Sequence, residues 1–132
     1  LNSRKVDNKI LSMKIMSYIK MDKHLKTIIK YANGNNYALR TEAYCSLISF
    51  IEKDKSVLEH IGAKHELSLL DINIIADTIL KRNNLEIDTD YLFSYGNKRR
   101  IMLGLLMVKY GKLKCKKRKY TVFIQQIHLY LQ

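Results

Sequence analysis

The sequence predicts an all-α domain, and three observations lead to this fold class. The 132 residues contain no proline, a residue that is frequent in the turns and loops of β-rich proteins. Apolar residues recur at three- and four-residue spacing along most of the chain, which is the period of an amphipathic helix. Clusters of asparagine and glycine interrupt this pattern, as expected where helices end. Because 47% of the residues are hydrophobic, we expect one domain with its own core over residues 1–132.

The N-terminal part predicts three helices in succession. Apolar residues at helical spacing over residues 10–19 indicate the first helix, and a short break follows at Met21 and Asp22. A second stripe covers residues 25–32 and ends at Asn33-Gly34-Asn35-Asn36, where left-handed backbone is easily adopted. The pattern resumes over residues 37–53. An Asn-Gly hairpin is not favoured, because no alternating apolar pattern flanks this turn.

The middle of the chain predicts a short helix and then a longer one. Residues 57–61 continue the preceding helix or form a short separate one, which Gly62 ends. Ser68, followed three residues later by Asp71, is typical of a capping box at the start of a helix. That helix covers residues 72–80 and ends at residues 83–84, which are both asparagine.

The C-terminal part predicts one strongly apolar helix and a weaker one. Residues 87–93 are ambiguous, and we interpret them as a short helix started by Asp88 or Thr89. A turn at residues 94–97 separates it from a helix over residues 98–110. Residues 123–131 show a last helical period, although β-branched residues leave a strand over residues 120–124 open. In all we expect about five to seven helices.

An internal repeat links the two halves of the chain. In both halves a polar turn is followed by an arginine near the start of an apolar helix. The alignment pairs Arg40 with Arg99, Ala43 with Met102, and Leu47 with Leu106, an offset of 59 residues. Such a turn makes an antiparallel helix pair, in which a small residue on the inner face lets the two helices approach.

This pattern resembles the HEAT repeat of armadillo-like α-solenoids, in which a polar turn precedes an apolar residue, an arginine and an alanine on the inner helix. Residues 37–43 (YALRTEA) are the better match, and residues 67–112 resemble a second, degenerate unit. The resemblance implies antiparallel helix pairs stacked as a short right-handed solenoid, similar to short HEAT-type domains of bacterial membrane-anchored proteins. The offset exceeds the roughly 40–47 residues of a standard repeat, and the helix near residues 57–61 would absorb the difference. Other helical bundles, a viral Bcl-2-like one among them, remain alternatives.

No constellation of residues predicts catalysis, a cofactor or a metal site. His60 and His65 lie five positions apart, which is not the spacing that places two ligands on one helical face. Cys45 and Cys115 form no CxxC pair, and no glycine-rich phosphate loop is present. We therefore expect a protein that is not an enzyme and that needs no cofactor.

Charge is the strongest chemical signal in the sequence. The formal net charge is +12, from 24 basic and 12 acidic residues. Residues 109–119 contain seven cations and no acid, and residues 98–100 form a second basic cluster. Such surfaces bind nucleic-acid phosphates, anionic lipid headgroups or acidic protein patches, and the same lysines also serve simply as solvated surface.

We expect a non-catalytic protein-binding or scaffolding module, because stacked helix pairs expose inner helices that hold partner proteins. The expected partner-binding residues are Arg40, Lys98, Arg99, Arg100, Lys114, Lys116, Lys117, Arg118 and Lys119. A protein partner is favoured, and an acidic protein patch or an anionic membrane surface is open as the site that the basic residues contact. The alternative is a basic helical protein that binds nucleic acid. Two repeats rarely suffice alone, so we also expect a homo-oligomer or further repeats.

A cytoplasmic location is expected. No signal peptide opens the chain, and two unpaired cysteines suit a reducing compartment. The longest apolar run, residues 101–108, has eight residues, whereas about 20 are needed to span a bilayer. The first residue is leucine, from which we interpret the chain as a piece of a longer protein, including the cytoplasmic part of a membrane-anchored one.

Overall fold

The computed structural model describes residues 2–82, 87–88, 98–109 and 113–114, and these residues form an all-α domain. The helices are α1 (Asn2–Ile19), α2 (Asp22–Ala32), α3 (Tyr37–Ile48), the 3₁₀-helix η1 (Lys55–His60), α4 (Leu69–Leu80) and α6 (Lys98–Lys109). Two strands of two residues each, β1 (Ile87–Asp88) and β2 (Leu113–Lys114), pair in parallel. The predicted all-α class is confirmed.

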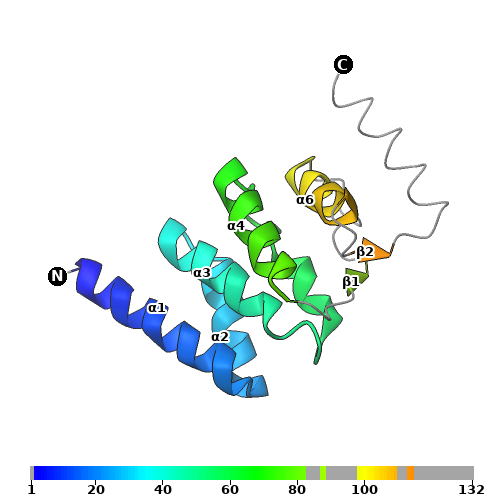
Figure 1. The fold of residues 1–132 in the computed structure, drawn as a ribbon. Coiled ribbons are helices and arrows are strands. Elements are labelled where there is room, and N and C mark those ends of the chain that lie inside the picture. Colours follow the sequence, from blue (N-terminus) through cyan, green and yellow to red (C-terminus); the bar gives the residue numbers. More distant parts are fainter. Residues whose placement is uncertain (1, 83–86, 89–97, 110–112, 115–132) are drawn as a thin grey trace.

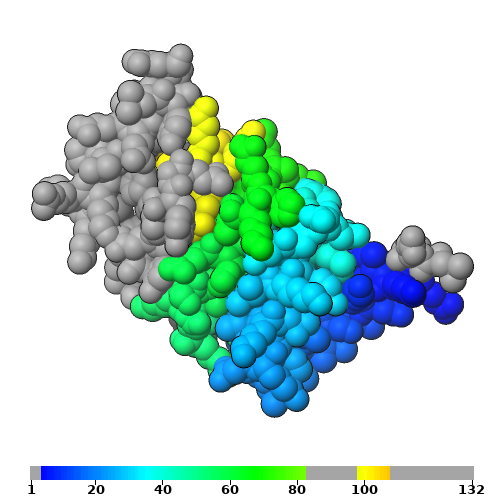
Figure 2. All heavy atoms as spheres, turned by 180° about the vertical axis from the view of Figure 1, so that it is seen from behind, coloured from blue at the N-terminus to red at the C-terminus, as the bar shows by residue number. Residues whose placement is uncertain are grey.

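Four helices, α1, α3, α4 and α6, lie side by side in a row, with α2 and η1 behind it (Figure 1). Within the row, α3 packs against α1 on one side and α4 on the other, and α6 packs against α4. The view from behind shows α2 and the segment that carries η1 at the surface (Figure 2). This arrangement makes α3 the central helix of the described part, since α2 and η1 also pack against it.

The hydrophobic core fills the space between the row and the two rear helices. α3 contributes the most buried side chains, because it has neighbours on four sides. One continuous cluster joins residues from all six described helices; its large members include Met13, Ile28, Tyr44, Leu47, Leu58, Ile75 and Met107. Burying a side chain of this size stabilises the fold by about 1.5–3 kcal/mol.

The helix boundaries near residues 21 and 33–36 agree with the sequence prediction, whereas α1 begins at Asn2, well before the apolar stripe over residues 10–19 that predicted it. α2 ends at its C-cap Asn33, and the Asn36 side chain accepts a hydrogen bond from the Leu39 N–H, 3.1 Å away, as the N-cap of α3. α3 is shorter than predicted, since it ends at Ile48 rather than near residue 53. The next residues form turns, yet Phe50 and Ile51 are buried, and this explains why the apolar pattern continued.

Three local features fix the backbone of the segment between α3 and α4: an N-cap, a left-handed glycine and a capping box. η1 is a separate short helix, and Asp54 caps its start. Gly62 has φ of +70°, a left-handed conformation that residues with a Cβ rarely adopt, and it ends this segment as predicted. The capping box is confirmed: Ser68 Oγ accepts from the Asp71 N–H, and Asp71 accepts from the Ser68 N–H, both at 3.0 Å.

The C-terminal predictions are only partly covered by the described residues. The helix expected over residues 98–110 is confirmed as α6. Ile87 and Asp88 pair with Leu113 and Lys114 as strands, so the short helix expected after them does not include Ile87 or Asp88. The predictions for residues 83–84, 89–97 and 115–132, including the last helix and the alternative strand, lie outside the described residues.

Candidate protein-binding surface

The packing of α6 shifts the internal repeat by one residue. The residues buried at four-residue spacing are Leu39, Ala43 and Leu47 on α3, and Leu103 and Met107 on α6. Met102, which the sequence alignment pairs with Ala43, is 43% exposed. The buried positions of α6 thus pair Ala43 with Leu103 and Leu47 with Met107, one residue later than the sequence alignment. Residues 101–108 are apolar on every side of the helix, so the spacing could not identify the buried face.

Arg100 is buried, contrary to the expectation that it forms part of an exposed edge. Its side chain is 1% exposed. Its two terminal nitrogens donate hydrogen bonds of 3.1 Å to the carbonyl oxygens of Leu58 and Glu59 in η1. Those carbonyls lie near the end of a 3₁₀-helix of six residues, where the Leu58 oxygen also accepts from the Ile61 N–H. Arg100 thus fastens η1 to α6, and it does not face a partner.

Arg40 is half-buried and fastens the start of α3 to the preceding turn. Its Nη1 donates to the Gly34 carbonyl oxygen at 3.2 Å, and its guanidinium lies 5.7 Å from the centre of the Tyr37 ring. The guanidinium of Arg40 also acts electrostatically on the buried hydroxyl of Tyr44. Burial raises the pKa of that hydroxyl, which therefore stays protonated.

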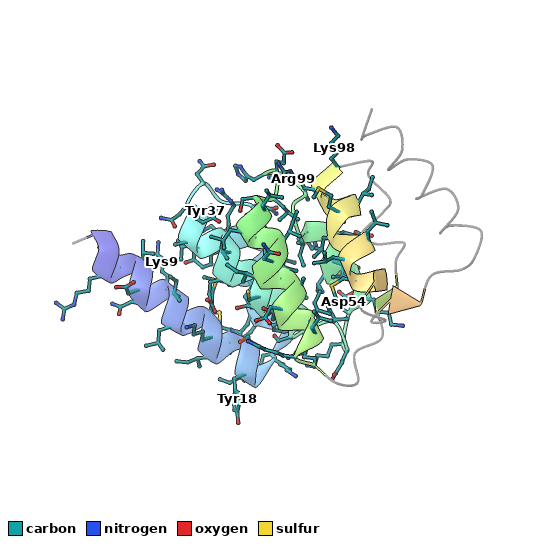
Figure 3. The ribbon with its side chains drawn as sticks, turned by 45° about the horizontal axis from the view of Figure 1, so that its top comes forward. Lys9, Tyr18, Tyr37, Asp54, Lys98 and Arg99 are labelled. Carbon is teal, nitrogen blue, oxygen red and sulfur yellow. The ribbon has the colours of Figure 1, made fainter. Side chains whose placement is uncertain are left out.

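The starts of α3, α4 and α6 meet at one edge of the molecule, which we call the N-terminal edge. The Tyr37 hydroxyl lies 3.1 Å from Ser68 Oγ, which joins the first turn of α3 to the cap of α4. Arg99 at the start of α6 forms an ion pair of 3.5 Å with Glu66, just before α4. Tyr37, Lys98 and Arg99 lie along this edge in Figure 3.

A buried polar contact reinforces the N-terminal edge. Thr41 Oγ1 donates to Asp71 Oδ1 at 2.9 Å, from α3 to the first turn of α4. Asp71 thus accepts from its own cap and from the neighbouring helix, although it is 4% exposed. A buried carboxylate is retained when its oxygens are hydrogen-bonded in this way.

The structure therefore brings together three of the predicted binding residues, Arg40, Lys98 and Arg99, at the N-terminal edge. Arg40 and Arg99 already have partners inside the protein, and this gives both a structural role. Lys114 is described only as part of β2. The remaining predicted residues, Lys116, Lys117, Arg118 and Lys119, lie outside the described residues.

A different surface, on α1, was not singled out in the sequence. Leu11, Ile15, Tyr18 and Ile19 are between 52% and 89% exposed and follow the spacing of one helical face, which we call the outer face of α1. The opposite face packs on the core. Tyr18 projects away from the body of the molecule in Figure 3. The signal was present in the sequence, since apolar residues occupy two faces of residues 10–19 rather than one.

The outer face of α1 lies on a basic helix. Residues 2–19 contain four basic residues and one acidic residue, a formal net charge of +3. At helical spacing, Lys5 and Lys14 lie on the two flanks of the outer face, and both are exposed. The single acid of α1 is Asp7. The surface thus combines apolar side chains with a surplus of cations.

Cys45 is the cysteine that the described residues contain. Cys45 on α3 is partly buried, with its Sγ 3.6 Å from Thr78 Oγ1 of α4. Burial raises the pKa of this thiol, which disfavours the nucleophilic thiolate. Within the described ranges, no group of three or more histidine, cysteine or acidic side chains is placed to hold a metal ion.

Comparisons of the chain with protein-family models, curated proteins and solved structures found no match. No helix in the described part of the chain combines the length and the apolar character needed to cross a membrane.

Proposed function

We propose that this chain is a non-catalytic protein-binding module. The observation that carries the proposal is the outer face of α1, where four large apolar side chains at one helical face are left in water. Single exposed apolar residues are common on protein surfaces, but a contiguous group is typical of an interaction site. Complete burial of each of these side chains against a partner would contribute up to about 1.5–3 kcal/mol to the free energy of binding.

The proposed scaffold is a short HEAT-like stack. In this proposal α1, α3, α4 and α6 take the role of inner helices, and α2 takes the role of an outer helix. Two features support it: the side-by-side row and the short turn that joins α2 to α3. A stack of this kind presents side chains of successive helices on an extended surface, which suits a partner protein rather than a small molecule.

The proposal is tested by selection from an unbiased library of displayed peptides with the purified chain as bait. We expect the wild-type chain to enrich a family of related peptides, and the double variant L11S/I15S to lose them. The matched control is L69S/L70S, which removes two apolar side chains of similar exposure on α4. Selection that enriches no peptide family would contradict the proposal, as would equal enrichment by L11S/I15S.

The net charge of +12 requires a test against nucleic acid as well. Binding of duplex and single-stranded DNA is measured by fluorescence anisotropy over a range of salt concentrations. For a protein that neutralises several phosphates, the logarithm of the binding constant falls steeply and linearly with the logarithm of the salt concentration. Micromolar binding at physiological salt with such a slope would favour a nucleic-acid-binding function instead.

A further inference from the structure

The shape of the outer face of α1 fits another helix. Leu11, Ile15 and Tyr18 are spaced by four and three residues, so their side chains form a ridge along α1. From residue 11 to residue 19 this ridge is about 12 Å long, given a rise of 1.5 Å per residue. A helix of about two to three turns covers such a ridge by packing its own apolar stripe against it.

The row of helices indicates where the occupant lies. α3 has α1 and α4 as its neighbours in the row, and α4 has α3 and α6. Among the described residues α1 has a row neighbour, α3, on one side only. The outer face of α1 is thus the position at which a further helix continues the row.

The charge around the outer face selects the kind of helix. Residues 2–19 of α1 carry a net charge of +3, and exposed Lys5 and Lys14 flank the apolar ridge. A second copy of this chain would bring two α1 helices of net charge +3 together, which like-charge repulsion opposes. Acidic side chains beside the apolar stripe of the incoming helix would instead face these lysines.

An anionic membrane would meet the same charges, but the apolar part of the surface is small. Four side chains on one short ridge offer little apolar area for insertion into a bilayer. A helix, by contrast, covers the whole ridge and places its own charges at both flanks.

We infer that the outer face of α1 binds an acidic amphipathic α-helix of a partner protein, which docks alongside α1 and continues the row. This inference rests on the proposed protein-binding function and specifies its partner. Apolar contacts with Leu11, Ile15, Tyr18 and Ile19 supply the affinity. The lysines at the flanks select the acidic partner and speed its encounter with this face.

The inference is tested with two designed peptides of equal length and equal apolar spacing. One has glutamate at the positions that flank the apolar stripe, and the other has lysine there. Binding to the purified chain is measured by fluorescence anisotropy. We expect the acidic peptide to bind at least about tenfold more tightly than the basic one, with affinity falling as salt screens the charges.

Substitutions place the peptide on α1. We expect I15E to weaken the acidic peptide at least about tenfold, because it places a charge within the apolar contact. The control A63E changes the net charge equally at an exposed residue outside the ridge. It should change the affinity by less than about twofold, since a single exposed charge contributes little. Far-UV circular dichroism verifies that both variants are folded.

Four outcomes would overturn the inference. They are equal binding of the acidic and basic peptides, equal effects of I15E and A63E, binding to phosphatidylserine vesicles that I15E abolishes, and a wild-type dimer in analytical ultracentrifugation that I15E dissociates. The library selection distinguishes this failure from that of the proposed function. Enrichment of non-acidic peptides that require Leu11 and Ile15 would contradict the inference of an acidic helical partner but would still support the proposed protein-binding function.

Discussion

Replacement of the buried Arg100 should cost this protein a large share of its stability. In R100M the apolar stem of the side chain keeps its packing, but the hydrogen bonds to the carbonyls of Leu58 and Glu59 are lost. A hydrogen bond that involves a charged group contributes about 1.5–3 kcal/mol, so these two contribute about 3–6 kcal/mol before offsets. Removal of a buried charge recovers part of its desolvation cost, which leaves an expected net loss of about 2–4 kcal/mol.

The assay is urea unfolding followed by far-UV circular dichroism, with the free energies of unfolding extrapolated to water. The matched control is R99M: Arg99 is partly exposed and pairs with the exposed Glu66, so we expect a loss below about 1 kcal/mol. If R100M does not fold, R100K should fold with intermediate stability, because one ammonium group keeps the charge but not the planar fork. An R100M protein within about 0.5 kcal/mol of wild type would refute the fastening role of Arg100.

Three further predictions concern local features of the fold. G62A should lose about 1–3 kcal/mol of stability, because its backbone is left-handed and a Cβ there would lie 2.8 Å from Leu67 Cγ. The control G34A should stay within about 0.5 kcal/mol of wild type, since a Cβ at that position has ordinary contacts. Thermal unfolding measures both variants. Burial raises the pKa of Glu42 in the folded protein, so its contribution to stability is complete below the unfolded pKa and is lost as pH rises through the folded value. E42Q should therefore be more stable than wild type at neutral pH and equally stable in acid. Equal free energies of unfolding of E42Q and wild type at neutral pH would contradict this. S68A removes the hydroxyl of the capping box and should cost about 1 kcal/mol in urea unfolding, whereas an unchanged midpoint would show that the cap contributes nothing.

The starts and ends of most described helices were predictable because their causes are local. The Asn33-to-Asn36 turn, Gly62 and the Ser68–Asp71 capping box each act within a few residues, and each has the predicted role in the structure. The end of α3 was not predictable from its pattern. Phe50 is buried by tertiary contacts after the helix has ended, so the apolar spacing continued past the boundary.

The candidate site was predicted less well than the fold. Arg40, Lys98 and Arg99 do share one edge, as the polar turns before their helices indicated. Arg100 looked like its basic neighbours, and no spacing rule shows that it reaches the carbonyls of η1, about 40 residues earlier in the chain. The outer face of α1 was missed because its apolar residues predicted burial, whereas they are exposed. Burial of an apolar residue also requires a neighbouring element to cover it.

The sequence by itself determined the all-α class, the positions of the turns and the high net charge, because helix periodicity, caps and composition depend only on residues near one another. Only the tertiary structure decided which sides of the helices are covered. It placed α3 among four neighbours and left the outer face of α1 in water. It also selected Leu103 and Met107, rather than Met102, as buried residues of α6. The physical reason is that the hydrophobic effect is non-directional: apolar side chains favour burial, but the packing of whole helices determines which of them achieve it.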